Sequence, residues 1–253
     1  MNPNHRPIIA IIGCDGSGKS TVGHHVTEWM EQYGPTVQVH LGKQSGNMLR
    51  SIKHWPIIGQ FLVKDIEKRG VKAKGRIEKN KLPGLLPALV NTFFVKRRLK
   101  RFRQMLKAYD DGNIIVTDRY PQLSVSGAYD GPKMPRIREG NRLVCWLADY
   151  ELNAFKWMTS YRPDLVIRLN VDFETACKRK PDHKPAALRR KIDATPKLEY
   201  RGAPIVDIDT TQPLDQVLQE VESAISTYTQ TSTSIEKEMT ETMPRNETAG
   251  SLQ

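Results

Sequence analysis

The chain opens with a short apolar segment that runs into a glycine-rich loop and then into a helix. Residues 7–12 (PIIAII) form a continuous apolar run, which is typical of a strand buried on both faces of a parallel sheet. After the loop at 13–21, apolar residues recur at helical spacing until Gly34-Pro35. Residues 36–41 then alternate as a second strand does. A strand, a tight turn, a helix and another strand make a βαβ unit, which predicts an α/β fold.

The loop matches the phosphate-binding pattern GxxxxGK[ST], with the residues Gly13, Cys14, Asp15, Gly16, Ser17, Gly18, Lys19, Ser20 and Thr21. Glycines let backbone N–H groups turn inward around phosphates, and the dipole of the following helix adds positive potential. Lys19 is expected to reach the β- and γ-phosphate oxygens, and Ser20 to place its hydroxyl on Mg²⁺. The sequence therefore predicts that a nucleoside triphosphate and Mg²⁺ bind here.

The rest of the chain alternates between predicted helices and predicted strands. Strands are expected at 113–117, 165–171 and 204–209, and helices at 87–109, 142–161, 174–180 and 213–225. This order predicts a parallel sheet of about five strands, covered by helices on both faces, as in P-loop NTPases. We expect one domain over 1–226 with a basic excursion at 42–84, and a disordered Ser/Thr-rich tail over 227–253.

Positive charge is concentrated in one part of the chain. The net charge is +11, and residues 43–107 contain eighteen Lys and Arg residues against three acidic residues. Such a segment favours a polyanion or an acidic membrane as a partner, although the basic face of helix 87–109 could simply be solvated. Trp146, Phe155 and Trp157 are expected in the core or at the contacts of a homodimer.

Cysteine usage and segment lengths bear on the compartment. Three cysteines, far apart and without CxxC spacing, favour a reducing environment. The sequence contains no apolar run of about 18 residues, and its N-terminus lacks the pattern of a signal peptide. The expected location is the cytoplasm.

Two classes of P-loop protein fit the sequence poorly. The GTPase tetrapeptide NKxD is missing, because Leu82 and Pro83 follow Asn80-Lys81. No long apolar strand ends in Asp-Glu, as in motor ATPases; the third predicted strand runs instead into Asp118-Arg119-Tyr120. These features favour a kinase.

The motifs together resemble the thymidylate kinase-like branch of the nucleotide kinases. The loop is close to that family's GxDGSGKST, the triplet Asp118-Arg119-Tyr120 matches its Asp-Arg-Tyr, and residues 128–131 (AYDG) resemble its AYQG. The strand ending in Asp172 is followed by a basic segment resembling the family's lid, over 178–191. The order of elements agrees across residues 7–225.

The resemblance implies a role for each matching residue. Asp118 corresponds to a carboxylate near the metal, and Arg119 to an arginine that holds the acceptor phosphate. Asp15 corresponds to a residue that contacts the acceptor's sugar hydroxyl, although it could merely shape the turn. Because the loop contains no arginine, the resemblance implies that the lid supplies the basic group, from Lys178, Arg179, Lys180, Arg189 or Arg190. The implied reaction moves the γ-phosphate of ATP to a nucleoside monophosphate such as dTMP.

Departures from the family pattern gather at the acceptor end. The second strand leads to His40-Leu41-Gly42-Lys43 in place of an Arg-Glu-Pro-like segment, and Asp130 replaces the usual glutamine. The spacing from Asp118 to Tyr129 is about two residues longer than in the family, and the 42–84 excursion has no counterpart. A sugar, glycan or lipid-linked acceptor therefore stays open, and a non-catalytic nucleotide-binding module is a third alternative.

Overall fold

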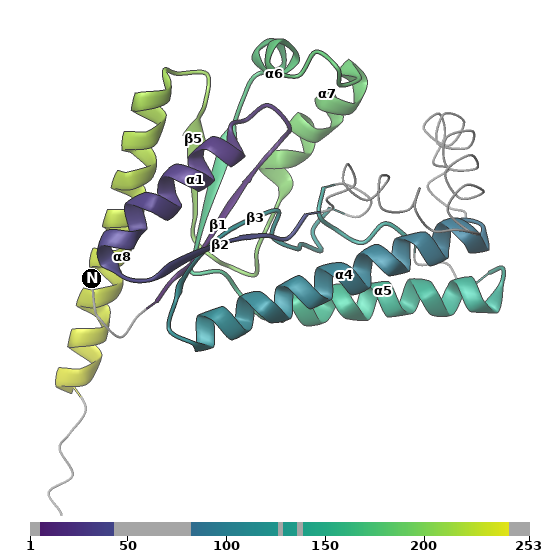
Figure 1. Cartoon of the computed structure of the whole chain (residues 1–253), viewed down its shortest axis with the longest axis horizontal. Helices are drawn as coiled ribbons and strands as arrows, with labels where there is room; N and C mark the ends of the chain where they lie inside the picture. Colours follow the sequence, from purple (N-terminus) through teal and green to yellow (C-terminus); the bar gives the residue numbers. More distant parts are fainter. Residues whose placement is uncertain (1–5, 43–81, 126–128, 136–138, 243–253) are drawn as a thin grey trace, which may run out of the picture.

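A computed structural model describes residues 6–42, 82–125, 129–135 and 139–242 of the chain (Figure 1). Most of the basic excursion, residues 43–81, lies outside the described residues, as do residues 243–253 of the predicted tail. The fold described below is therefore that of the sheet, its helices and the region of the predicted lid.

One parallel sheet forms the centre of the molecule, and this confirms the predicted α/β class. Its order is β2-β3-β1-β4-β5, with β1 at Ile8–Gly13, β2 at Thr36–His40, β3 at Ile114–Asp118, β4 at Leu165–Asn170 and β5 at Ile205–Asp209. The chain moves from β1 toward β3 and β2 on one side, and later places β4 and β5 on the other. Parallel α/β sheets bind ligands outside the carboxyl ends of their strands where the order switches in this way.

The register of the sheet brings the motifs together at that edge. Asp118 pairs with Ile11 of β1 on one side and with His40 of β2 on the other. Gly13, where the phosphate loop begins, pairs with Leu169 of β4. Residues that are far apart in the sequence thus meet at the carboxyl edge.

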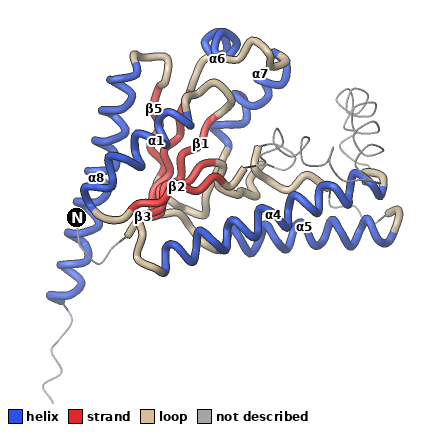
Figure 2. Tube along the Cα trace, in the orientation of Figure 1, coloured by secondary structure: helices blue, strands red, loops and turns tan. Residues whose placement is uncertain are grey.

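Helices cover both faces of the sheet, as predicted (Figure 2). On one face, α1 (Lys19–Met30) and α8 (Leu214–Thr242) enclose a core with β1, β3 and β4. On the other face, α4 (Leu85–Asp110) and α5 (Arg142–Ser160) enclose a second core that includes Phe102 and Tyr120. No helix within the described ranges combines the length and apolar content needed to cross a bilayer.

Helix α4 departs from its predicted amphipathic division at one position. Val95, Leu99 and Phe102 face the core as expected. Arg98, which the pattern assigns to the solvated face, is also buried and is 6% exposed. Its hydrogen bonds, described below, explain how a guanidinium can be buried there.

The region of the predicted lid contains two short helices, of which only the first was expected. Helix α6 (Phe173–Arg179) and helix α7 (Pro185–Ala194) are separated by a turn, and the 3-10 helix η2 (Thr195–Lys197) follows. Pro185 occupies the first turn of α7. The backbone N–H that proline lacks would have no partner within the helix at this position, so nothing is lost there. A proline inside a longer helix would break it, so the chain begins a new helix there.

Helix α8 is much longer than predicted. It was expected to end at Ile225, with disorder from residue 227, but it continues to Thr242. The prediction of disorder is therefore wrong for residues 227–242. This stretch is rich in Ser and Thr but contains neither proline nor glycine, so nothing in it interrupts a helix already anchored by Val217, Val221 and Ile225.

Candidate active site

The backbone of the phosphate loop takes a shape that only glycine adopts readily. A side chain at Gly13 would put its Cβ 2.6 Å from the Leu169 carbonyl oxygen, and Gly18 has a φ of +83°. Gly18 is also the N-cap of α1, and no side chain caps the first amides of the helix. These N–H groups need an acceptor, and a phosphate is the ligand that helix N-termini favour.

Lys19 folds back over this loop. Its Nζ donates to the carbonyl oxygen of Cys14 at 2.5 Å. Burial, together with the nearby positive charge of Arg119, lowers the pKa of Lys19 to about 8. The ammonium group is thus held inside the loop, where an anionic ligand would stabilise its charge.

Asp118 offers an oxygen that the protein does not use. Its Oδ2 is hydrogen-bonded to His40 Nδ1 at 2.9 Å. Its Oδ1 lies 2.7 Å from the same nitrogen but outside hydrogen-bond geometry. Within the described residues, Asp118 Oδ1 and Ser17 Oγ are the buried side-chain oxygens and nitrogens without a hydrogen-bond partner. Both belong to residues of this site.

These oxygens fit a magnesium nucleotide. Ser20 is exposed in the first turn of α1, so a hydroxyl and a carboxylate flank the loop. The described part of the chain has no cluster of three His, Cys, Asp or Glu residues that would hold a metal unaided. Mg²⁺ commonly takes only one or two carboxylates and completes its shell with water and substrate phosphates, as this donor set would allow.

Asp15 is the centre of a group of ion pairs. It pairs with Lys191 of α7 and with Arg119 at 3.3 Å, and His183 Nε2 lies 3.7 Å from its Oδ2. Burial opposes its ionisation, but the hydrogen bond from Lys191 and the surrounding cations outweigh this and hold the pKa of Asp15 below its ordinary value. The predicted contact with an acceptor sugar stays a prediction, since these cations occupy the carboxylate here.

Arg119 adopts an unusual backbone conformation at the end of β3. Its φ is +56°, in the left-handed region that residues with side chains rarely enter. Such strain concentrates at functional sites. The conformation brings the guanidinium to Asp15, 104 residues earlier in the chain.

Two of the predicted lid arginines, Arg179 and Arg189, differ in their positions. Arg179 donates to the carbonyl oxygens of Gly16 at 3.1 Å and Thr210 at 2.8 Å, so it lies against the phosphate loop. Arg189 stacks on the ring of Phe173, 4.0 Å from its centroid. The structure therefore brings Arg179, but not Arg189, together with the loop.

Lys191 and His183 contact the loop but were not among the predicted site residues. Both fall within the predicted lid, 178–191, which was assigned a catalytic arginine and not a partner for Asp15. Tyr129 holds this part of α7, since its hydroxyl donates to the Lys191 carbonyl oxygen at 2.7 Å and contacts Thr195 Oγ1. The only sequence signal was the basic composition of the segment.

Arg98 and Asp130 form a buried pair beside the site. Arg98 donates to the Asp130 carboxylate, to the Asp130 carbonyl oxygen at 2.8 Å and to the Leu41 carbonyl oxygen at 2.9 Å. The carboxylate at position 130 is thus neutralised. Through these bonds Arg98 links α4 to the loop after β3 and to the end of β2.

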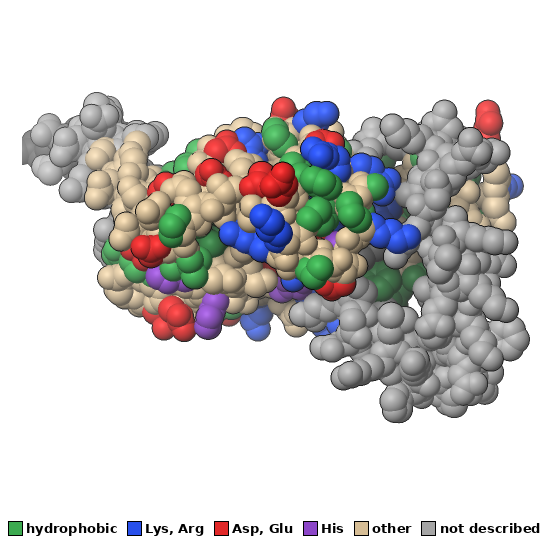
Figure 3. Space-filling model, turned by 90° about the horizontal axis from the view of Figure 1, so that it is seen from above, with side chains coloured by type: hydrophobic (Ala, Val, Ile, Leu, Met, Phe, Trp, Pro, Cys, Tyr) green, Lys and Arg blue, Asp and Glu red, His purple; other side chains and the backbone are tan. Residues whose placement is uncertain are grey.

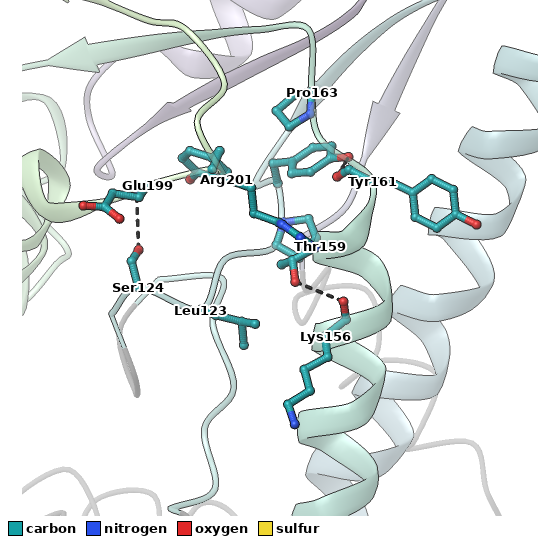
Figure 4. Close-up of a pocket in the computed structure, with 11 residues that line it drawn as sticks. Leu123, Ser124, Lys156, Thr159, Tyr161, Pro163, Glu199 and Arg201 are labelled. Carbon is teal, nitrogen blue, oxygen red and sulfur yellow. Dashed lines mark hydrogen bonds between the residues drawn. The ribbon is translucent and has the colours of Figure 1, made fainter.

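A separate hollow of about 460 Å³ lies beside the end of α5 (Figure 4). Its wall includes Tyr120, Leu123, Tyr161 and Tyr200, and the Glu199 N–H donates to Ser124 Oγ across it. None of the predicted site residues lines this hollow. The candidate active site is therefore the open edge around the phosphate loop.

The fold and this edge define a P-loop nucleotide-binding protein, as predicted. The chain belongs to the family of two ATP-binding proteins of Escherichia coli K12. It is 39% identical to the uncharacterized ATP-binding protein YghS, over 84% of this chain and 89% of that protein. It is 36% identical to the uncharacterized ATP-binding protein YghR, over 88% and 89% of the two chains.

The similarity to thymidylate kinases is weaker. The chain is 26% identical to a probable thymidylate kinase of Archaeoglobus fulgidus, over 87% of this chain and 95% of that protein. The crystal structure of thymidylate kinase from Ehrlichia chaffeensis aligns with a TM-score of 0.43 and 18% identity, over 88% and 99% of the chains. No protein-family model matches the sequence.

Proposed function

We propose that the protein is an ATP-dependent phosphotransferase that moves the γ-phosphate of ATP to a nucleoside monophosphate such as dTMP. The observation that carries the proposal is the meeting of Lys19, Asp118 and Arg119 at one edge of the sheet. Phosphoryl transfer depends almost entirely on positioning and on charge stabilisation, and these residues offer both. The similarity to a probable thymidylate kinase supports this choice of reaction.

Each residue has a task that its position favours. Lys19 and the first amides of α1 hold the phosphates of ATP, while Ser20 and Asp118 hold Mg²⁺. Mg²⁺, when bound, neutralises charge on the β- and γ-phosphates. Arg119 would leave Asp15 to hold the acceptor phosphate, because a phosphate offers a guanidinium two charged oxygens at once.

A non-nucleotide acceptor is the second candidate. The observation that favours it is the pairing of His40 with Asp118, at the place where the kinase family has an Arg-Glu-Pro-like segment. In addition, the Asp130 carboxylate is occupied by Arg98 and is not available to a nucleotide base. Sugars, glycans and lipid-linked glycans are the acceptors to compare.

The proposal is tested by measuring ADP formation at saturating ATP and Mg²⁺ over a panel of acceptors. The panel contains dTMP, dUMP, the other nucleoside monophosphates, thymidine and simple sugars. Stimulation by a monophosphate above all other acceptors is the expected result. Lys19→Ala is the control: it should keep its circular dichroism spectrum, because alanine is a good helix former at the first position of α1, and lose the activity.

Two outcomes would contradict the proposal. Stimulation by a sugar, with none by any nucleotide, would assign the protein to the second candidate. The other outcome is a wild-type protein that binds ATP but forms no more ADP than Lys19→Ala with any acceptor. This result would indicate a non-catalytic nucleotide-binding module.

A further inference from the structure

Exposed apolar side chains are concentrated at one end of the molecule. Of the nine large hydrophobic residues exposed in the described ranges, six lie in the first turns of α4 and α5. We call these six the apolar tip: Leu85, Leu86, Leu89, Phe93, Leu143 and Trp146. Phe93 is 50% exposed and Trp146 61%. Single exposed apolar residues are ordinary, whereas a cluster of this kind marks an interaction surface.

The apolar tip projects beyond the sheet. Helix α4 has 26 residues, whereas the strands have five or six. At about 1.5 Å per residue the helix is ~39 Å long, and a strand of this length spans ~20 Å. Helices α4 and α5 lead into β3 and β4, so the excess length extends past the carboxyl edge (Figure 1).

The projecting end is internally packed. Ala88, Val144 and Leu147 are buried against one another and against Met134. Asn91 of α4 donates to Glu151 of α5 at 2.9 Å, and Glu151 also accepts from the Met134 N–H at 2.8 Å. The exposed side chains of the tip therefore stand on a fixed base.

A basic row continues the exposed face of α4. Exposed positions follow one another three or four residues apart, which places them on one side of a helix. Leu85, Leu89 and Phe93 begin this row, and four cations complete it: Lys96, Lys100, Arg103 and Lys107. Asp110 at the end of α4 and Asp149 on the neighbouring α5 are exposed acidic residues, and the four cations outnumber them. On the face seen in Figure 3, by contrast, acidic and basic side chains are interspersed.

We propose that the apolar tip and the basic row dock the protein on the surface of an anionic phospholipid bilayer. Trp, Phe and Leu side chains enter the boundary between headgroups and acyl chains, while lysines and arginines are attracted to anionic headgroups. A second copy placed face to face on the same row would bring like charges together. The charge therefore favours a lipid surface over a homodimer.

The test is co-flotation of the full chain with vesicles of phosphatidylcholine alone, or with about one third phosphatidylglycerol. At about 0.1 M salt we expect the protein to float with the anionic vesicles and not with the neutral ones. At about 1 M salt the bound fraction should fall several-fold, because the screening length shrinks from ~10 Å to ~3 Å. Binding that does not change with salt, or equal binding to neutral and anionic vesicles, would overturn the charge argument.

Matched variants locate the contact. Leu89→Ser and Trp146→Ser should each lower the bound fraction several-fold, whereas Leu214→Ser, which removes a leucine 52% exposed at the start of α8, should not. Lys100→Glu should weaken binding, and Lys197→Glu, an equal charge change on η2, should not. Unchanged binding by both tip variants would overturn the proposal.

Light scattering after gel filtration distinguishes the alternative occupant. A wild-type dimer that Trp146→Ser converts to a monomer, with no vesicle binding, would show that the tip contacts a second copy. A wild-type protein that floats with anionic vesicles and keeps its oligomeric state in Trp146→Ser supports the lipid surface.

Discussion

Lys19 must be positively charged to bind phosphate, but its surroundings in the free protein disfavour that charge. Burial disfavours its ammonium form, and Arg119 adds like charge, so its pKa falls to about 8 in the free protein. Phosphate oxygens would supply the missing negative charge. Binding of a nucleotide therefore favours the protonated lysine and raises its pKa again.

The affinity for ATP should depend on pH through this residue. Below pH 8 the lysine is protonated before binding, so the affinity is at its full value. As the pH rises above 8, a proton must be taken up on binding, and the Kd should increase by up to about tenfold per pH unit. Calorimetry in two buffers of different ionisation enthalpy measures both the Kd and the proton uptake.

Lys19→Arg serves as the control, because a guanidinium stays charged throughout this range. It should show a flat Kd between pH 7.5 and about 9 if Lys19 is the group that titrates. The same slope in Lys19→Arg as in the wild type would mean that another group near the loop takes up the proton.

The buried pair of Arg98 and Asp130 makes a separate prediction about stability. Removing one member leaves a buried charge without its partner, so Arg98→Met should lower the free energy of unfolding by about 3–5 kcal/mol. The double change Arg98→Met with Asp130→Leu should recover much of this loss, since no unpaired charge then stays buried. Urea unfolding of the wild type, Arg98→Met, Asp130→Leu and the double variant measures the coupling.

Lys100→Met is the matched control for this pair. It changes a cation of α4 that is exposed, and it should alter the free energy of unfolding by no more than about 0.5 kcal/mol. A similarly small effect of Arg98→Met would mean that the pair does not hold α4 to the loop at Asp130.

At the scale of elements, α6 and α7 approach the phosphate loop from the side opposite β3. Arg179 at the end of α6 contacts Gly16, and Lys191 of α7 pairs with Asp15. Tyr129 links α7 to the loop after β3, and burial raises the pKa of its hydroxyl, which favours the neutral donor. The lid is thus held by contacts to two other elements of the site.

Single substitutions in the lid should therefore have unequal effects. An arginine that stabilises the charge of phosphoryl transfer is worth ~10³–10⁵ in rate, so Arg179→Ala should lower kcat by that order with little change in the Kd for ATP. Arg189→Ala should change kcat by less than about tenfold, since it loses a stacking contact with Phe173. Steady-state kinetics with separate ATP titrations compares them.

Arg190→Ala is the control for Arg189→Ala, because Arg190 is exposed on the same helix, α7. Equal losses of kcat for Arg179→Ala and Arg189→Ala would contradict the assignment. Loss of ATP affinity, rather than kcat, in Arg179→Ala would show that the residue only shapes the loop.

At the scale of the whole molecule, two cores lie on the two faces of one sheet. Helix α8 joins the first core through Val217, Val221 and Ile225, with Tyr228 packed at its border. The packed side chains that the structure describes on this helix end there. Beyond that point α8 continues as a helix to Thr242.

Truncation should separate the two parts of α8. Deleting residues 232–253 should leave the free energy of unfolding within about 0.5 kcal/mol of the full chain, since no described core contact is removed. The helical signal in circular dichroism should fall all the same. Ile225→Ala is the comparison and should cost ~2–5 kcal/mol, because it opens a cavity in the core. A large loss of stability on truncation would show that the end of α8 is bound to the rest of the protein.

The sequence by itself determined the features that depend on neighbouring residues. The phosphate loop needs left-handed backbone at Gly16 and Gly18, and only local residue type decides this. The apolar runs of β1 and β3 and the spacing within α4 likewise specify a strand or a helix locally. The number of strands, their parallel arrangement and the helices on both faces followed from the order of these segments.

Tertiary structure decided which charges are paired and which helices continue. Arg98 belongs to a basic run, and only the packing of α4 on the loop at Asp130 makes it a buried partner. Lys191 reaches Asp15 across 176 residues, and no pattern within the lid specifies that contact. Composition predicted disorder from residue 227, yet α8, which is anchored where it packs on the sheet, stays helical to Thr242. The physical reason is common to all three: the free energy of an ion pair or of an extended helix depends on neighbours that folding brings from elsewhere in the chain.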